Sequence, residues 1–285
     1  MPLAEKPVPE RRLAMNETLA IARLGQRGDG IAEAPDGPVF VPYALPGETV
    51  RVVRDGERGQ LVEIIAPASS RIAAICPLFT RCGGCAAQHM DEALYCAWKR
   101  QQVVTALERA GIEAPVADAV DAHGQGRRRV TFHARREGLG MMVGFMAART
   151  HDLVAVESCP VLSPGLARGP AVAQLLANRL GQSNKPLDIQ ITASDAGLDV
   201  DIRGHGPAGD KLRLSLTDAA ERLDLARLSM HGEIVVERRP PQQRMGKAMV
   251  APAPGSFLQA TVTCEETIAS LVLAALPKRG KRAAD

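Results

Sequence analysis

Four cysteines have the type and spacing to bind an iron–sulfur cluster. They are Cys76, Cys82, Cys85 and Cys159. Three soft thiolates close together, with a fourth from far along the chain, are what a [4Fe–4S] cluster requires. Gly83 and Gly84 lack a Cβ atom, so we expect the backbone there to approach closely and to direct N–H groups at cluster sulfurs. Proline directly after a ligand, as at Pro77 and Pro160, also recurs in bacterial iron–sulfur motifs.

Two other uses of these cysteines remain open. Zinc also takes four thiolates, but its structural sites usually come as two closely spaced pairs, whereas this chain has one triplet and a distant singlet. A disulfide framework suits a short secreted chain, but charges and prolines interrupt the first fifteen residues, so we expect no signal segment. Cys96 and Cys264 fit neither spacing, and we expect them to be small core residues.

The composition suits a protein of two or three domains. A chain of 285 residues with 46% apolar content is long and apolar enough to form more than one hydrophobic core. Because no apolar run approaches about 18 residues, we expect no membrane contact. A net charge of +3 permits a polyanionic partner, while 3% aromatic content limits binding through many stacked bases. We expect a monomer located in the cytoplasm, where thiols stay reduced.

Short strands separated by glycine turns predict an N-terminal β-barrel. Residues 1–13 are charged and contain prolines, which is typical of a loose arm. Residues 14–66 hold five short strands and no helical period, which predicts a closed five-stranded barrel of the OB type. Such barrels commonly bind single-stranded or looped RNA, although the same pattern suits a generic β-barrel adaptor.

Residues 67–252 predict the cysteine-rich segment followed by a mixed α+β domain. A helix capped by Asp91 should run to Arg109, and Gly111 should end it. The later elements mix strands and helices. The predicted strands are 129–134, 141–146, 152–156, 187–192, 198–203 and 233–237, and the predicted helices are 166–180 and 218–225.

Three consecutive arginines stand at the start of this domain's first strand. Arg127, Arg128 and Arg129 could face RNA phosphates, and Arg135 and Arg136 add to the same charge. The alternative is a solvated strand edge whose charges discourage aggregation. The run is therefore a candidate RNA contact.

Residues 253–285 form a separate final stretch. Thr263 and Glu266 match a capping box for an amphipathic helix at Glu265–Leu276, which Pro277 should stop. The residues up to Asp285 then begin a strand that has no continuation. We expect a chain that is a fragment or an interrupted reading frame.

At these residues the chain resembles a known family. From about Asn16 to Asp285 it is similar to the N-terminal two-thirds of a bacterial S-adenosylmethionine (SAM)-dependent RNA (uracil-5-)-methyltransferase, of the class with a TRAM domain and a [4Fe–4S] cluster that modifies 23S rRNA. The matching residues are Gly28-Asp29-Gly30, Val39–Pro42, Leu45-Pro46-Gly47-Glu48, the four cysteines with Gly83, Gly84, Gln88 and His89, Val143–Val156 and Phe257-Leu258-Gln259.

The resemblance implies a reaction and a cofactor. The full enzyme would bind SAM on a Rossmann-like domain that begins at about residue 253. A cysteine would attack C6 of a uracil turned out of its stack, so that C5 accepts the methyl group. Gln259 matches a glutamine that contacts SAM. Phe257 matches an aromatic residue near the flipped base, or it could instead anchor the last helix in a core. Thr261 stands where the family often has asparagine.

The family's glycine-rich cofactor loop, its catalytic cysteine motif and its general base do not occur in these 285 residues. We therefore assign no catalytic residue, and we expect this chain to be the RNA-recognition and cluster-binding portion, inactive alone. The cluster should be structural, because methyl transfer from a sulfonium moves no net electrons. Two alternatives are an iron–sulfur redox module and an RNA-binding adaptor that holds zinc or an iron–sulfur cluster.

Overall fold

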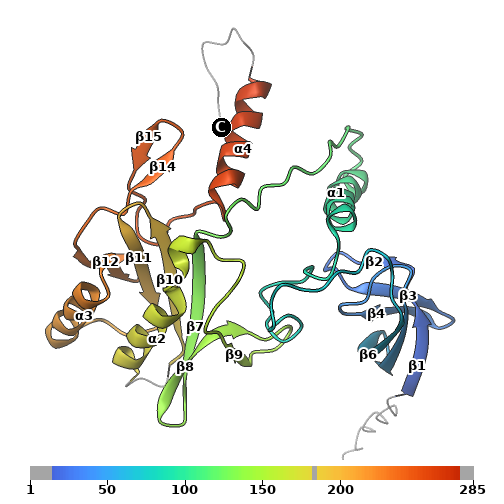
Figure 1. The fold of residues 1–285 in the computed structure, drawn as a ribbon, viewed down its shortest axis with the longest axis horizontal. Helices are drawn as coiled ribbons and strands as arrows, with labels where there is room; N and C mark the ends of the chain where they lie inside the picture. The colour runs from blue at the N-terminus through green and yellow to red at the C-terminus, as the bar shows by residue number, and fades with distance from the viewer. Residues whose placement is uncertain (1–14, 182–184, 277–285) are drawn as a thin grey trace, which may run out of the picture. The chain divides into compact units, whose positions relative to one another are not determined.

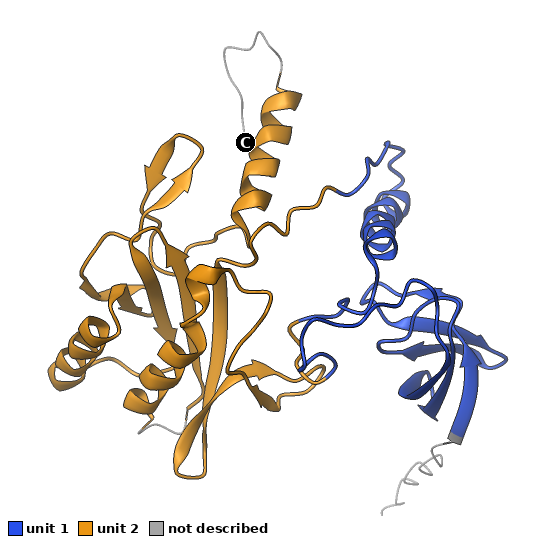
Figure 2. Cartoon of the chain, in the orientation of Figure 1, with its two compact units in different colours: residues 1–80, 85–119 blue, residues 81–84, 120–285 orange. Residues whose placement is uncertain are grey.

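The computed structural model describes residues 15–181 and 185–276. The chain forms two compact units, which Figure 2 colours separately. Unit 1 comprises Met1–Thr80 and Cys85–Ala119, and unit 2 comprises Arg81–Gly84 and Val120–Asp285. The division falls within the predicted segment 67–252. The predicted arm at 1–13 and the predicted strand at 283–285 lie outside the described residues.

Unit 1 is built around a closed sheet. Its strands are β1 (Met15–Ala20), β2 (Arg23–Leu24), β3 (Gly30–Ala34), β4 (Gly37–Val41), β5 (Thr49–Asp55) and β6 (Arg58–Ala66), paired in the order β1-β5-β6-β4-β3-β2. Between β1 and β2, the N–H of Ile21 donates to the Glu48 carbonyl next to β5 (2.9 Å), and that of Ala22 donates to the Ile31 carbonyl in β3 (2.8 Å). One continuous segment thus pairs with β5 and then with β3, which closes the sheet into five segments, the number that the glycine turns predict.

Aliphatic side chains alternate into the centre of this barrel. Val39, Val41, Val50 and Val52 are fully buried, and the residues between them face outward. Gly30 lets β3 pass close to the backbone before β5, because a Cβ atom there would lie 2.7 Å from the Ala44 carbonyl oxygen. The second glycine of the Gly-Asp-Gly motif is therefore required by sterics.

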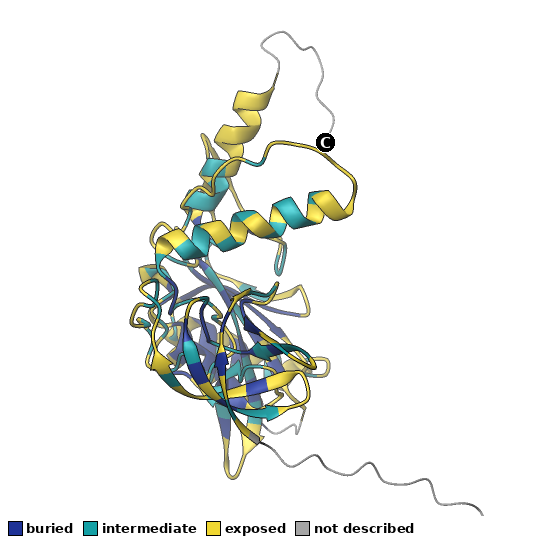
Figure 3. Ribbon diagram, turned by 90° about the vertical axis from the view of Figure 1, so that its right-hand side faces the viewer, coloured by how far each residue is buried: buried dark blue, intermediate teal, exposed yellow. Residues whose placement is uncertain are grey.

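Helix α1 (Glu92–Arg109) belongs to unit 1 and begins where the sequence predicts. Asp91 caps it by accepting a hydrogen bond from the Leu94 N–H (2.8 Å). Gly111 follows the helix with a φ of +68°. Every residue of α1 falls in the described part of the chain and none is buried, so the helix is yellow and teal along its length in Figure 3. The predicted apolar face is therefore only partly covered.

Unit 2 contains a seven-stranded sheet in the order β13-β12-β11-β10-β7-β8-β9 (Figure 1). Its elements are β7 (Arg129–Glu137), β8 (Gly140–Met146), β9 (Leu153–Ala155), the 3₁₀ helix η1 (Pro164–Leu166), α2 (Gly169–Leu180), β10 (Leu187–Ser194), β11 (Gly197–Arg203), α3 (Asp210–Arg222), β12 (Leu225–Met230), β13 (Glu233–Glu237), the hairpin β14 (Gln243–Met245) and β15 (Ala248–Val250), and α4 (Val262–Ala275). Within the sheet, β11 and β12 are parallel and the other neighbours are antiparallel.

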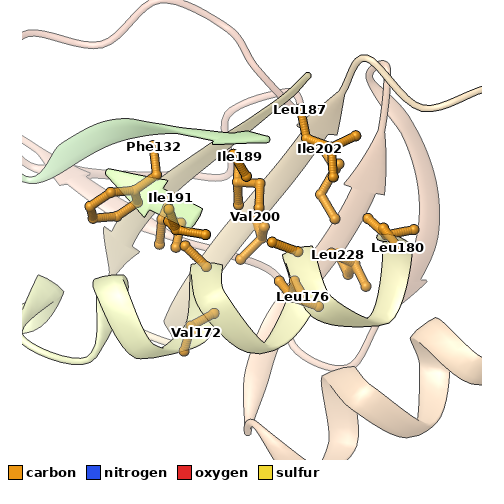
Figure 4. Close-up of a cluster of buried hydrophobic side chains, with 14 of the residues drawn as sticks. Phe132, Val172, Leu176, Leu180, Leu187, Ile189, Ile191, Val200, Ile202 and Leu228 are labelled. Carbon is orange, nitrogen blue, oxygen red and sulfur yellow. The ribbon is translucent and has the colours of Figure 1, made fainter. Parts of the chain in front are cut away.

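The two faces of this sheet differ in chemistry. Apolar side chains of alternate positions pack against α2 and α3 and form the core (Figure 4). The core residues that this figure labels on strands are Phe132, Leu187, Ile189, Ile191, Val200, Ile202 and Leu228. The positions between them carry charged or polar groups, including Arg129, Thr192, Asp199, Asp201 and Arg227. The second face therefore has a network of ionic side chains, several of them buried.

In unit 2 the bounds of one predicted helix are wrong, and the strand that follows it was not predicted. The predicted helix 218–225 is the end of α3, which stops at Arg222, and β12 begins at Leu225. Asp224 has a φ of +48°, which ends the helix, and all six residues of β12 are buried. Residues 226–230 alternate Ala-Arg-Leu-Ser-Met, which is the period of a strand, but no element was predicted for them.

The predicted capping box of the last helix is also wrong. Thr261, rather than Thr263, caps α4 by accepting from the Cys264 N–H (2.9 Å). None of the helices within residues 15–181 and 185–276 combines the length and apolar character that a bilayer crossing needs.

Candidate functional site

Two of the predicted cluster ligands, Cys76 and Cys85, lie in unit 1. The backbone N–H of Cys76 donates to Gln88 Oε1 (3.1 Å), and the N–H of Phe79 donates to the Cys76 carbonyl (3.1 Å). Both thiols are half-buried. Gln88, which matches the family motif, therefore ties the first cysteine to the turn that follows the third.

The other two predicted ligands, Cys82 and Cys159, lie in unit 2. The N–H of Gly84 is directed at the Cys82 sulfur, with an N···S distance of 3.4 Å. The N–H of Gly83 instead donates to the Met146 carbonyl at the end of β8 (2.9 Å). A Cβ atom on Gly83 would lie 2.9 Å from that oxygen. The close approach expected of the two glycines is present, but Gly83 uses it to pair with a strand rather than with a thiol.

The four thiols are divided equally between the units. Considering only the described residues, no three side chains of His, Cys, Asp or Glu are gathered as a metal site would need. Each thiol is half-buried, and thiolates are the donors that iron–sulfur clusters and zinc prefer. The N–H directed at Cys82 is a contact that stabilises a negatively charged sulfur. The donor chemistry therefore fits a thiolate-bound metal centre.

His89, from the same motif, is a buried neutral imidazole in unit 1. Its ring packs against Phe79 and Tyr43, with centroid distances of 5.3 and 6.1 Å. Neither ring nitrogen has a hydrogen-bond partner among the residues that the structure describes. Burial is the main cause that lowers the pKa of His89 to about 4; the charge of nearby Arg71 also lowers it, and the charge of Glu48 opposes the shift. The imidazole is therefore uncharged at neutral pH.

Glu48 ends the Leu-Pro-Gly-Glu turn and forms an ion pair with Arg71. Its buried carboxylate accepts from Arg71 Nη2 (2.8 Å) and from the Leu45 N–H (2.8 Å). Burial alone would raise the pKa of Glu48, but the hydrogen bonds from Arg71 and Leu45 and the positive charge of Arg71 together hold that pKa below its usual value. Arg71 Nη2 also donates to the Tyr43 carbonyl (2.7 Å). This pair thus ties the barrel to the start of the cysteine-rich segment.

The predicted RNA-contacting arginines have different surroundings. Arg127 is exposed. Arg128 is 4% exposed, forms an ion pair with Glu265 and donates through Nε to the Gln259 carbonyl (3.2 Å). Arg129 is half-buried and donates to Thr192 Oγ1 (2.8 Å). Because Arg128 is buried and paired, its guanidinium is not presented to a phosphate, and the prediction that it faces RNA does not match this structure.

Arg128, Arg129 and Arg227, which we call the arginine clamp, hold the chain between β15 and α4. Arg227 Nη2 donates to the Pro252 carbonyl (2.8 Å), and Arg129 Nη1 donates to the Ser256 carbonyl. Arg128 contacts the same stretch at Gln259, as described above, and its backbone N–H donates to the Ala260 carbonyl (2.8 Å). The clamp therefore fixes the backbone on both sides of Phe257.

Phe257 and Gln259 both lie within this clamped stretch. Phe257 is 84% exposed, whereas its neighbour Leu258 is buried. The side-chain oxygen of Gln259 lies 3.9 Å from the Cys264 sulfur. Thr261 Oγ1 donates to the Ala122 carbonyl (2.5 Å) in addition to capping α4. The exposure of Phe257 does not agree with a core anchor, which was the alternative for this residue.

Sequence reasoning missed the ion pair that supports the clamp. Arg227 donates through Nε and Nη2 to the two oxygens of Asp199 (both 2.9 Å), and the two side chains are buried. The alternation Leu198-Asp199-Val200-Asp201 carried the signal, because it places both carboxylates on the face opposite the core. The partner of Asp199 could not be read from the sequence, since no strand was predicted at Arg227.

Comparisons with known proteins lead to RNA methyltransferases. No family model matches the chain. An uncharacterized RNA methyltransferase of Brucella suis is 39% identical over 94% of the chain, and one of Caulobacter vibrioides is 40% identical over 90%. A 23S rRNA (uracil(1939)-C(5))-methyltransferase of Shewanella amazonensis is 26% identical over 89%. The chain spans 64%, 64% and 61% of the length of these three relatives.

The fold of the chain is also similar to that of an RNA methyltransferase. The tRNA (uracil-54, C5)-methyltransferase of Pyrococcus abyssi, solved in complex with S-adenosyl-L-homocysteine, matches 92% of the chain with a TM-score of 0.64. The chain covers 66% of that protein at 15% identity, which shows likeness of fold alone. Over about nine tenths of its length, the chain is thus similar to RNA methyltransferases in sequence and in fold.

Proposed function

We propose that this chain is the RNA-recognition and cluster-binding portion of a SAM-dependent RNA (uracil-5-)-methyltransferase. The observation that carries the proposal is the similarity to RNA methyltransferases of about 40% identity along nine tenths of the chain. The relative that acts on uracil 1939 of 23S rRNA favours rRNA as the substrate, at 26% identity. The solved tRNA enzyme has a similar fold, so uridine C5 is the target atom we propose.

Cys76, Cys82, Cys85 and Cys159 would hold a [4Fe–4S] cluster in this proposal. Thiolate donors, the N–H of Gly84 directed at Cys82, and the close packing of Gly83 support a cluster-binding segment. Binding of the cluster by these thiolates would be coupled to folding of the segments that carry them. The role of the cluster would be structural, as the reaction transfers no electrons.

Gln259 and Phe257 would contact the cofactor and the target base. SAM would supply the methyl group. The arginine clamp supports this assignment, because it fixes the backbone of the stretch while leaving Phe257 exposed to a partner. Arg127, exposed beside the clamp, would meet the RNA backbone. Cys264 would not be the nucleophile, because it lies in the capped first turn of α4 with its sulfur near Gln259.

Three measurements on the anaerobically purified chain test the proposal. We expect about four iron and four sulfide per chain, binding to a 23S rRNA fragment that weakens steeply as salt rises, and no methyl transfer to C5 from SAM. Zinc in place of iron would refute the cluster, and undetectable RNA affinity at low salt would refute the RNA-recognition role. Methyl transfer by the chain alone would refute the proposal that this chain supplies only RNA recognition and cluster binding.

A further inference from the structure

Two of the chain's few aromatic side chains lie next to each other on α1. The sequence has one tryptophan and two tyrosines, and Tyr95 and Trp98 are neighbours with ring centroids 6.2 Å apart and planes inclined by 53°. Both residues are half-buried. A pair of rings at a partly open helix surface offers area for stacking, which a fully buried pair does not.

A lysine lies over both rings. Lys99 Nζ is 5.9 Å from the centroid of Tyr95 and 5.5 Å from that of Trp98, and the Lys99 residue is exposed. An ammonium at this distance is attracted by the ring faces. A ring pair and a positive charge are therefore presented together at one place on unit 1.

The barrel holds Trp98 in a fixed position. Its Nε1 donates to the Gly25 carbonyl (2.9 Å), and Gly28 lies so close that a Cβ atom there would contact the indole at 3.5 Å. Gln26 and Arg27, between these two glycines, are exposed. The tryptophan is thus anchored along one edge, and a second cation is carried by the loop that anchors it.

We propose that Tyr95, Trp98 and Lys99, with Arg27 beside them, form a stacking platform for an unpaired base of single-stranded RNA. Aromatic faces stack on any base, and flanking cations contact the phosphates on either side, which is how proteins commonly bind single strands. Lys99 would leave the ring faces for a phosphate when a base takes its place. This inference rests on the proposed RNA-recognition function and adds a second contact surface, in unit 1, separate from Phe257.

The test uses the intact chain and a fluorescein-labelled single-stranded oligouridine of about a dozen nucleotides, a length typical of one OB-type barrel. Anisotropy of the label measures binding. Trp98 is the only tryptophan, so its emission reports directly on the platform. We expect RNA to quench Trp98 with the same dissociation constant that anisotropy gives.

Two variants and a matched control complete the test. Tyr95→Leu keeps apolar bulk and should weaken binding by about tenfold through loss of stacking. Lys99→Gln should lower the slope of log affinity against log salt by about 0.7, the value of one phosphate contact on a single strand. Arg109→Gln removes an exposed charge ten residues further along the same helix, about 15 Å away, and should leave quenching unchanged.

The outcomes separate this inference from the proposed function. RNA binding with unchanged Trp98 emission, or with Tyr95→Leu and Lys99→Gln as tight as the parent, would overturn the platform and leave RNA recognition standing. Equal weakening by Arg109→Gln would reduce the effect to net charge and would also overturn it. Absence of RNA binding at low salt would refute both the stacking platform and the proposed RNA-recognition function.

Discussion

Acidification should destabilise unit 1 through His89. The pKa of this buried imidazole is lowered from 6.5 to about 4, so the unfolded chain binds a proton in that window and the folded chain does not. Stability must then fall as pH drops from 6.5 toward 4. The full shift corresponds to about 3 kcal/mol, of which about 2 kcal/mol is lost between pH 7 and pH 5. Glu48 contributes mainly below that interval, since its pKa is lowered from 4.5.

The measurement is urea unfolding followed by Trp98 emission at pH 7 and pH 5. Trp98 lies in unit 1 and is bonded to the barrel at Gly25, so it reports on that unit. His89→Phe keeps a ring beside Phe79 but cannot titrate, and it should remove most of the pH-dependent loss. His151→Gln, at an exposed position of unit 2, is the matched control and should behave as the parent chain does.

Two results would refute this reasoning. The first is a parent chain whose unfolding midpoint, as reported by Trp98, is the same at pH 5 and pH 7. The second is a His89→Phe variant that still loses about 2 kcal/mol over the interval, since another group would then carry the effect.

Three further predictions concern unit 2. Cys159→Ser should lower the iron content of anaerobically purified chain and reduce its melting temperature, and unchanged values of both would remove Cys159 from the ligands. Arg128→Met should lower the free energy of unfolding by about 3 kcal/mol, because it leaves the Glu265 carboxylate without its partner. Amide hydrogen exchange of residues 256–265 should become faster, and unaltered exchange would count against the clamp. Phe257→Ala should change the free energy of unfolding by less than about 0.5 kcal/mol, since the ring is exposed, and it should lower the affinity for RNA. A large loss of stability would mean that Phe257 has a structural role.

Local signals in the sequence predicted much of the fold. Asp91 before an amphipathic stretch predicted the start of α1, and glycine turns between short alternating runs predicted the strands of the barrel. The prediction failed where two residues of the same type could each have filled one structural role. Thr261 and Thr263 both stand near the start of α4, and only the backbone geometry shows that Thr261 is the cap. Leu225–Met230 is interrupted by Arg227 and Ser229, and no strand was predicted there.

The candidate site was harder to predict because its contacts are distant in sequence. Arg128 stands in a run of cations, which favours a solvent-facing role, yet its carboxylate partner Glu265 is 137 residues away. The Arg227–Asp199 pair spans 28 residues and depends on the parallel pairing of β11 with β12. The cysteine spacing, by contrast, is a local pattern that needs no knowledge of the fold, and the metal it implies remains a prediction.

The four residues Arg81–Gly84 belong to unit 2 although the residues on either side of them belong to unit 1. Their backbone satisfies the carbonyl of Met146, and Cys82 forms a bridge with Ala147. Any attempt to express unit 2 alone from residue 120 onward would discard this tetrapeptide and expose an unpaired carbonyl where β8 ends. The two units are consequently poor candidates for dissection or for exchange between homologues, because neither can be excised by a single cut.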